Sequence, residues 1–389
     1  MASWSVETAD CRDLLASLPD KCVEAACDDP PYEINFAGAA WDRSGVAFDA
    51  AVWRELLRVC KPGAHHISFG AARTYHRLAC AQEDAGWGIR DGMAWVYASG
   101  MPKSVNLSKA VDEHLGHTAD RPIVGYQTLT GTAATSFGKE GRLLGEGAAT
   151  GQKKVIPLTT GASAEAQQWD GWGTGQTPAW EPIVLSRRPL EGTLAENLLQ
   201  YGTAGLHIDA CRLENGWMPP GVTMLDGQVM VTGQFPKNVL LDEAAAELYL
   251  PKTQQPMFFC SKVSNQEREF GCEALPLLNS EELTGRKIGS VGTNNARAGA
   301  GRSSKGRANY HKTVKPVRLL RYLLRLIVPP GGVVLDLFAG SGSMGIAAAF
   351  EGFDYIGVEL DPGHQHIASH RIAAAHALMA SGAPLPKWA

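Results

Sequence analysis

Strand and helix patterns alternate at the start of the chain. Short apolar runs at 23–27, 64–70 and 93–98 predict buried strands, and apolar residues at helical spacing predict helices over 48–59 and 73–85. Because strands that alternate with helices form parallel sheets, this part predicts one half of a doubly wound α/β domain.

The same alternation returns in the last part of the chain. A helix is predicted over 316–327, since its apolar residues cover one broad side and two prolines and two glycines follow it. A strand at 333–338, a helix at 344–350, a strand at 354–360 and a helix at 363–378 come next. This order is the β-α-β unit of a nucleotide-binding fold.

The middle of the chain lacks a sustained period. Gly, Thr, Ala and Ser dominate 128–177, which is typical of long loops in an insertion, while 192–201 predicts a short helix and 257–263 a strand. The sequence therefore divides into five parts, which are an N-terminal half of the α/β domain (1–100), a first insertion (101–180), a strand that returns to the sheet (181–190), a second insertion (191–310) and a C-terminal half of the domain (311–389).

Composition indicates a water-soluble globular protein with a large core, since 44% of the 389 residues are hydrophobic. The eight cysteines include no C-x-x-C pair, so neither a zinc site nor a disulfide framework is predicted. No export signal and no long apolar run is found, and we expect a cytoplasmic protein without membrane contact.

Charge points to a local rather than a general polyanion site. The formal net charge is −4, yet eleven lysines and arginines between Arg286 and Arg325 occur without one Asp or Glu. This run fits either a solvated loop followed by an amphipathic helix or a segment that binds phosphates.

A glycine turn follows the strand at 333–338. Gly340, Gly342 and Gly345 fit G-x-G-x-x-G at the start of a helix, and Glu359 ends the next strand. Such a turn admits a phosphate or another close ligand, and the acid can bind ribose hydroxyls, so NAD, FAD and S-adenosylmethionine all remain open.

The order of the parts predicts which strands are neighbours. Too few residues follow Glu359 to complete a sheet, so the remaining strands must come from the N-terminal part. We therefore expect a sequence-permuted sheet in which 23–27 lies beside 333–338. Residues 29–32 and 338–342 then meet at the carboxyl ends of these strands, on one crevice.

Three motifs resemble one known family. The sequences DPPY at 29–32, DLFAGSG at 336–342 and HKTVKP at 311–316 are similar to the catalytic, methionine-loop and cofactor-binding motifs of the amino-group DNA methyltransferases, in the class whose catalytic motif comes first. Lys312 departs from the usual proline. Stretches beginning at Ser99, Ala179 and Gly192 also resemble phage and bacterial site-specific members.

The resemblance implies a Rossmann-like fold and methyl transfer from S-adenosylmethionine to a base flipped out of duplex DNA. Asp29 and the Pro30 carbonyl would accept hydrogen bonds from the amino group, Pro31 would stiffen the motif, and Tyr32 would stack on the base. The two insertions would contact DNA and read the target site.

The resemblance also implies a cofactor site. Glu359 would hold the ribose, Lys315 would pair with the methionine carboxylate, and Asp10 and Cys11 would lie near the adenine. The further cofactor residues implied are Thr313, Asp336, Phe338, Ala339, Gly340 and Gly342.

Several alternatives stay open at this stage. In the family, Asp at the first motif position accompanies adenine-N6 more often than cytosine-N4 specificity, so adenine is preferred and cytosine is the rival. Methyl transfer to RNA or protein, an NAD-dependent oxidoreductase and a catalytically silent DNA-binding protein are less favoured. A metal at His364, His366 and His370 is not expected, and the sequence leaves open whether the protein is a monomer or a homodimer.

Three tryptophans in or beside the first insertion would either stack on DNA or pack a small subdomain, namely Trp169, Trp172 and Trp180.

Overall fold

The computed structural model describes most of the chain. The described residues are 2–35, 40–98, 104–129, 154–213, 221–225, 228–242, 245, 258–260, 262–279, 282 and 306–389. They form two compact units. Unit 1 comprises 1–97, 180–275 and 311–389, and unit 2 comprises 98–179 and 276–310, each within the described residues.

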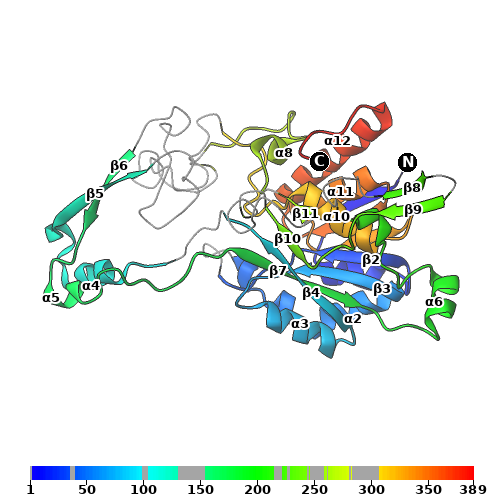
Figure 1. The fold of residues 1–389 in the computed structure, drawn as a ribbon, viewed down its shortest axis with the longest axis horizontal. Helices are drawn as coiled ribbons and strands as arrows, with labels where there is room; N and C mark the ends of the chain where they lie inside the picture. The colour runs from blue at the N-terminus through cyan, green and yellow to red at the C-terminus, as the bar shows by residue number, and fades with distance from the viewer. Residues whose placement is uncertain are drawn as a thin grey trace. The chain divides into compact units, whose positions relative to one another are not determined.

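A nine-stranded sheet forms the centre of unit 1 (Figure 1). In spatial order its strands are β1 (Trp4–Thr8), β13 (Asp354–Glu359), β12 (Val333–Asp336), β2 (Val23–Asp28), β3 (Cys60–Phe69), β7 (Trp180–Arg187), β4 (Gly88–Val96), β10 (Val239–Leu241) and β11 (Phe258–Phe259). Strand β7 pairs antiparallel with β3 and β4, whereas the other recorded pairings in this sheet are parallel. The α/β fold class expected from the sequence is confirmed.

The expected contact between the two ends of the chain is present. Strand β12 pairs in parallel with β2, and Val334 and Leu335 lie opposite Ala25 and Ala26. The residues that follow these two strands therefore begin at the same edge of the sheet. That the order arose by permutation stays a prediction.

Helices cover both faces of the sheet. In Figure 1, α2 and α3 lie on one side and α10, α11 and α12 on the other. Each side has its own apolar core, one that includes residues of α1, α2 and α3 and one that includes residues of α10, α11 and α12. The helix bounds are α1 Cys11–Ser17, α2 Ala50–Val59, α3 Tyr75–Asp84, α6 Leu194–Tyr201, α8 Asn265–Glu269, α10 Val317–Ile327, α11 Ser343–Glu351 and α12 Pro362–Ser381.

Some elements of unit 1 differ from the sequence prediction. Strand β1 and helix α1 were not expected, because five and seven residues are too short to show a clear period. Strand β4 begins five residues before the expected 93, and β11 is shorter than the expected 257–263, two residues of which lie outside the described part. Short 3₁₀ helices lie at Ala40–Arg43, Val46–Phe48 and Asp209–Cys211, and β8 (Gly221–Leu225) and β9 (Gln228–Thr232) form a hairpin.

Unit 2 packs around a buried carboxylate. Asp112, in helix α4 (Leu107–Leu115), accepts hydrogen bonds from the Ala162 and Ser163 amides, at 2.9 and 3.2 Å, and from Arg121. The ring of Trp169 meets that of Trp172 edge-on, with centroids 5.9 Å apart. The unit also contains a 3₁₀ helix (Thr118–Asp120), helix α5 (Ala164–Gln167) and a hairpin of β5 (Ile123–Leu129) and β6 (Lys154–Thr159).

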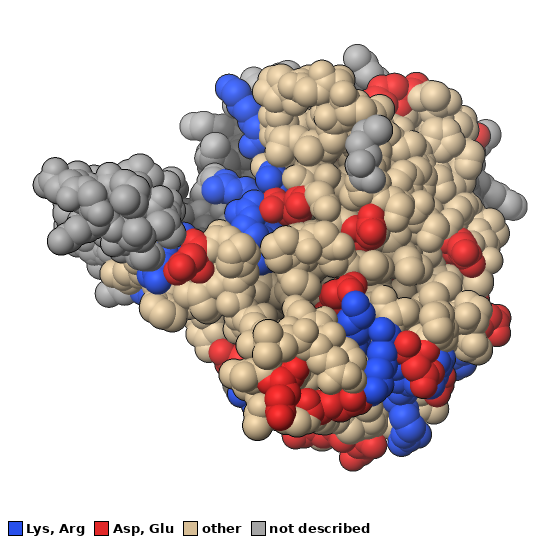
Figure 2. Space-filling view, turned by 90° about the vertical axis from the view of Figure 1, so that its right-hand side faces the viewer, with Lys and Arg blue, Asp and Glu red and all other residues tan. Residues whose placement is uncertain are grey.

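The described end of the basic run lies in helix α10. Arg321 and Arg325 both pair with Glu351 of α11, at 2.7 and 2.6 Å, and the choice between a solvated run and a phosphate-binding segment stays a prediction. Residues 286–305 of the run lie outside the described part, whereas 306–325 are described. On the face drawn in Figure 2, lysines and arginines lie beside acidic residues, and uncharged residues cover most of the described surface.

Three further features concern compartment and metals. All eight cysteines are free thiols. Among the described helices, none combines the length and the apolar character needed to span a membrane. The described residues include no cluster of three or more His, Cys, Asp or Glu able to hold a metal, and the rings of His366 and His370 on α12 meet edge to face, with centroids 4.4 Å apart.

Candidate active site

The glycine turn after β12 depends on two left-handed residues. Gly340 has φ +53° and Gly342 has φ +79°, a region that favours glycine. A Cβ on Gly342 would lie 2.9 Å from the Ala368 Cα of α12, and one on Gly340 would lie 3.0 Å from His311 Nε2. The turn is therefore pressed between α12 and the segment that precedes α10, as the motif requires.

A cavity of about 410 Å³ opens beside this turn. Its volume falls within the range of small-molecule sites, about 300–1,000 Å³. Eleven of the fourteen residues selected from the sequence line it, namely Asp10, Cys11, Asp29, Pro31, Thr313, Lys315, Asp336, Phe338, Ala339, Gly340 and Glu359. The other three, Pro30, Tyr32 and Gly342, belong to the same two turns but do not line the cavity.

Two acids at the edge of the cavity are held by backbone amides. Glu359 accepts hydrogen bonds from Gly340 N at 2.8 Å and Asp361 N at 2.9 Å. Asp10 caps helix α1 by accepting from Arg12 N at 2.9 Å. Each carboxylate is thus fixed in orientation while it still faces the cavity.

Beside Asp10, burial raises the pKa of Cys11 to about 12, so the thiol is neutral at pH 7.

Buried acids join the two strands behind the cavity. Asp28 accepts from Leu337 N at 2.6 Å and lies 2.8 Å from His66 Nε2, which ties the end of β2 to the turn after β12. Asp336 accepts from the Tyr355 hydroxyl at 2.9 Å. Burial, and then the charge of Asp28, raise the pKa of Asp336 well above its usual range.

Lys315 contacts the motif at 29–32 and Glu181. Its Nζ donates to Asp29 Oδ2 at 2.6 Å and to the Tyr32 hydroxyl at 3.0 Å, and lies 3.4 Å from Glu181 Oε2. The Tyr32 hydroxyl in turn donates to Glu181 at 3.0 Å. The expectation that Lys315 pairs with a methionine carboxylate remains untested, and its ammonium is already surrounded by two protein carboxylates.

This arrangement leaves one acceptor of the motif without a hydrogen bond. Asp29 Oδ1 is buried and, among the described residues, has no hydrogen-bond partner. Burial raises the pKa of Asp29, and Lys315 opposes this shift. Burial would lower the pKa of Lys315, but Asp29 and Glu181 outweigh it and raise that pKa. The pair therefore favours a charged lysine beside a carboxylate that is less acidic than usual.

Sequence reasoning missed several residues of the site. Glu181 begins the return strand, and an acid among its apolar residues was the available signal. Arg371 of α12 is fully buried and donates to Ser341 O at 2.6 Å and to Glu267 O at 3.0 Å, which supports the glycine turn from below. Trp41 lines the cavity without a signal in its local sequence, and His364, weighed from the sequence only as a metal ligand, lines it too.

Comparison with known proteins identifies the family. A family model described as DNA methylase, covering N6 and N4 enzymes, matches residues 23–370. The YubD protein of Escherichia coli (strain K12) is 40% identical over 79 residues, which is 20% of this chain and 35% of YubD. The type II methyltransferases M.XycI of Xanthomonas campestris pv. cyanopsidis and M.Cfr9I of Citrobacter freundii are each 37% identical over 65 residues, 17% of this chain and 22% of either relative. The chain thus spans well under half the length of these curated relatives.

Solved structures give a more distant match. PvuII DNA methyltransferase (cytosine-N4-specific) has a TM-score of 0.44 at 12% identity, covering 98% of this chain and 94% of that one. The complex of M1.HpyAVI with SAM has a TM-score of 0.40 at 12% identity, covering 95% and 100%. The family model spans most of the chain and both motif-bearing strands, and on that match the protein belongs to the N6/N4 DNA methylase family.

Proposed function

We propose that this protein is a site-specific DNA methyltransferase that moves a methyl group from S-adenosylmethionine to the N6 amino group of an adenine flipped out of duplex DNA. The observation that carries the proposal is Asp29 Oδ1, a buried carboxylate oxygen without a partner among the described residues, which belongs to a residue that lines the cavity beside the glycine turn. An exocyclic amino group is a donor that fits such an acceptor.

The residues around the cavity fit this cofactor. Glu359 is held by backbone amides and would bind the ribose hydroxyls, and Asp10 and Cys11 line the same cavity and would contact the adenine. Gly340 adopts a positive φ and packs against His311, where a Cβ would lie 3.0 Å from the ring. Further lining residues of the cavity are Asp336, Phe338, Ala339 and Thr313. Gly342 has the positive φ that the glycine turn needs.

Chain residues then act on the base by orientation and charge. When bound, S-adenosylmethionine supplies a methyl group whose bond to sulfur breaks as the nitrogen–methyl bond forms, and the nitrogen releases one proton. Asp29 Oδ1 accepts the hydrogen bond of the amino group and takes that proton, and the Pro30 carbonyl is the second acceptor. Pro31 limits the motion of the motif, and the ring of Tyr32 offers a stacking face.

Adenine is the preferred base because the motif begins with Asp, the residue that accompanies N6 specificity in the resemblance. Cytosine-N4 remains the second candidate, since its amino group would meet the same acceptor. Duplex DNA is the proposed partner, contacted through 101–180 and 191–310, and the cytoplasm is the proposed compartment. Two of the similar proteins are type II methyltransferases.

Transfer of tritium from labelled S-adenosylmethionine to duplex DNA tests the proposal. We expect incorporation that the Asp29→Ala variant abolishes, and nucleoside analysis of the product identifies N6-methyladenine or N4-methylcytosine. If neither the wild-type protein nor the Asp29→Ala variant incorporates tritium into any duplex, the proposal is contradicted. A catalytically silent DNA-binding protein would then remain. Sequencing methylated positions in DNA from expressing cells then gives the recognition site.

A further inference from the structure

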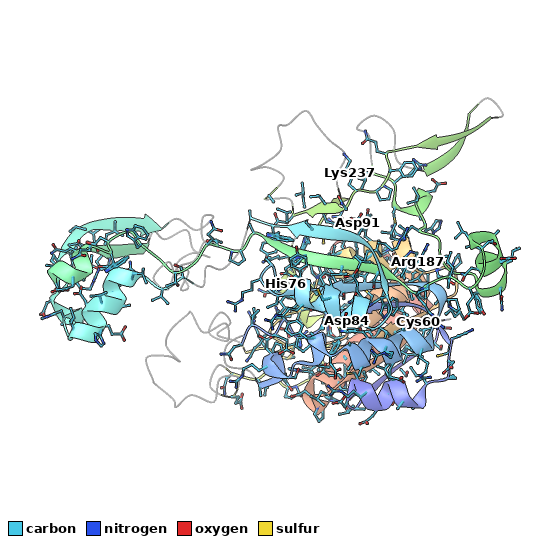
Figure 3. All side chains as sticks on the ribbon, turned by 90° about the horizontal axis from the view of Figure 1, so that it is seen from below. Cys60, His76, Asp84, Asp91, Arg187 and Lys237 are labelled. Atoms are coloured by element: carbon cyan, nitrogen blue, oxygen red, sulfur yellow. The ribbon has the colours of Figure 1, made fainter. Side chains whose placement is uncertain are left out.

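Glu181 lies at the catalytic edge of the sheet because its strand runs in the opposite direction to its neighbours. It is the second residue of β7 and lies opposite Trp95, near the carboxyl end of β4. Arg187, labelled in Figure 3, ends β7 at the other edge, where β3 begins at Cys60. A single antiparallel strand thus brings an acid to the edge where the parallel strands place Asp29.

Two carboxylates share one ammonium at this point. Lys315 Nζ is 2.6 Å from Asp29 and 3.4 Å from Glu181, and the Tyr32 hydroxyl links Lys315 to Glu181 through hydrogen bonds of 3.0 Å on either side. Glu181 is therefore a second acceptor for Lys315, held ready by the catalytic tyrosine.

We propose that Glu181 is a positioning residue, which takes over the Lys315 ammonium when Asp29 loses its charge to the amino-group proton. This inference rests on the proposed function. Before transfer, Lys315 pairs with ionised Asp29. Afterwards Asp29 is neutral, and without Glu181 the buried ammonium would have no anionic partner within this cluster, which costs free energy.

The surrounding charges are consistent with this exchange. The titratable groups around Glu181 are Asp29 and Tyr32 after β2, Tyr97 after β4, Asp242 after β10, Lys262 after β11 and Lys315 before α10. A second cation of the cluster, Lys262, has its Nζ 3.5 Å from the centroid of the Tyr97 ring. This cation–π contact holds Lys262 over that ring. Lys315 is the cation recorded in contact with both Asp29 and Glu181.

Single-turnover methyl transfer across pH tests the role of Glu181. In Glu181→Gln we expect the rate to fall by about tenfold to a hundredfold at pH 7.5 while S-adenosylmethionine binds as before, and Glu181→Asp to recover part of the rate. The acid limb of the profile should move to lower pH, since the Glu181 charge adds to the rise in the pKa of Asp29. The proposal would be overturned if Glu181→Gln kept both the wild-type rate and the wild-type acid limb of the pH profile. A slower rate with an acid limb at the wild-type pH would overturn it as well.

A folding experiment tests the same exchange without activity. Asp29→Asn imitates the neutral acid, so Glu181→Gln should lower the folding equilibrium constant at least fivefold more in the Asp29→Asn background than in the wild-type chain. Equal effects in both backgrounds would overturn the proposal. Glu7→Gln, an exposed acid on β1, serves as the matched control and should act alike in both. If the wild-type chain methylates no DNA, the proposed function fails, whereas this comparison still decides whether Glu181 and Asp29 share Lys315.

Discussion

Lys315 Nζ and Asp29 Oδ2 are 2.6 Å apart, although 286 positions separate the two residues in the chain. The contact joins the segment before α10 to the end of β2. It forms because β2 and β12 are neighbours and the segment just before α10 brings Lys315 to the same edge of the sheet. The charge state of Asp29 therefore depends on Lys315, which belongs to the segment before α10.

Asp29→Asn should reduce methyl transfer far more than cofactor binding. The amide oxygen can still accept a hydrogen bond, but it cannot take the amino-group proton, so we expect kcat to fall by about 10²- to 10⁴-fold. Equilibrium dialysis with labelled S-adenosylmethionine should show nearly unchanged affinity, because the cofactor contacts proposed for Glu359 and Asp10 remain. Wild-type kcat in this variant would remove Asp29 from the mechanism.

Lys315→Met should destabilise unit 1 at neutral pH. It leaves Asp29 and Glu181 without their shared cation, and breaking a buried pair costs about 3–5 kcal/mol. Because both carboxylates keep about a fifth of their side-chain surface exposed, we expect the low end of that range, measured by urea unfolding.

Acid should reduce this deficit. Without Lys315 the pKa of Asp29 rises further above its unfolded value, so the folded chain binds a proton that the unfolded chain does not. Such a group favours folding more as pH falls through its folded pKa. The free energy of unfolding of Lys315→Met should therefore approach that of the wild-type chain between pH 7 and pH 5. A difference that is constant over this range would show that Asp29 does not titrate there.

Gly342→Ala tests the packing of the turn. The new Cβ would lie 2.9 Å from the Ala368 Cα and 3.0 Å from its carbonyl oxygen, and backbone atoms cannot swing aside. Gly352→Ala is the matched control, since Gly352 has nearly the same φ, +78°, but nothing within 4 Å of its Cβ position. We expect Gly342→Ala to cost about 1–3 kcal/mol more than the control in thermal unfolding. If Gly342→Ala and Gly352→Ala lost the same stability, α12 would have to shift away from the new methyl group at no cost.

Much of the fold followed from the sequence because local pattern and chain order agreed. The strands at 23–28 and 333–336 are short, apolar and followed by special turns, and their expected pairing is present in the sheet. The residues of the glycine turn could be selected because positive φ and close packing demand glycine at fixed positions.

The contacts of Lys315 could not be predicted in this way. Its partners come from the end of β2 and the start of β7, and neither spacing nor periodicity encodes which of two buried acids an ammonium will meet. Helix α4 was missed for another reason: the described side chains it buries, Ser108 and Asp112, are polar, so its inward face carries no apolar repeat.

Asp112 should make the stability of unit 2 depend on acid. Burial would raise the pKa of this carboxyl, but hydrogen bonds from Ala162 and Ser163 outweigh it and lower the pKa to about 2. A folded pKa below the unfolded value of about 3.9 contributes stability above that value, and this stability is lost as pH falls toward 2. Hydrogen exchange of peptides from 104–129 and 154–179, corrected for the intrinsic rate, should therefore accelerate from pH 5 to pH 3.

Two variants separate this effect from general acid unfolding. Asp112→Asn should exchange quickly at both pH values, because the amide cannot hold the charge that Arg121 pairs with. Asp120→Asn removes an exposed acid of the same unit, with a side chain 67% exposed, and should keep the wild-type acceleration. If peptides of unit 2 stay as protected at pH 3 as at pH 5 in the wild-type chain, Asp112 does not organise the unit through its charge, and its hydrogen bonds would have to act equally well when it is protonated.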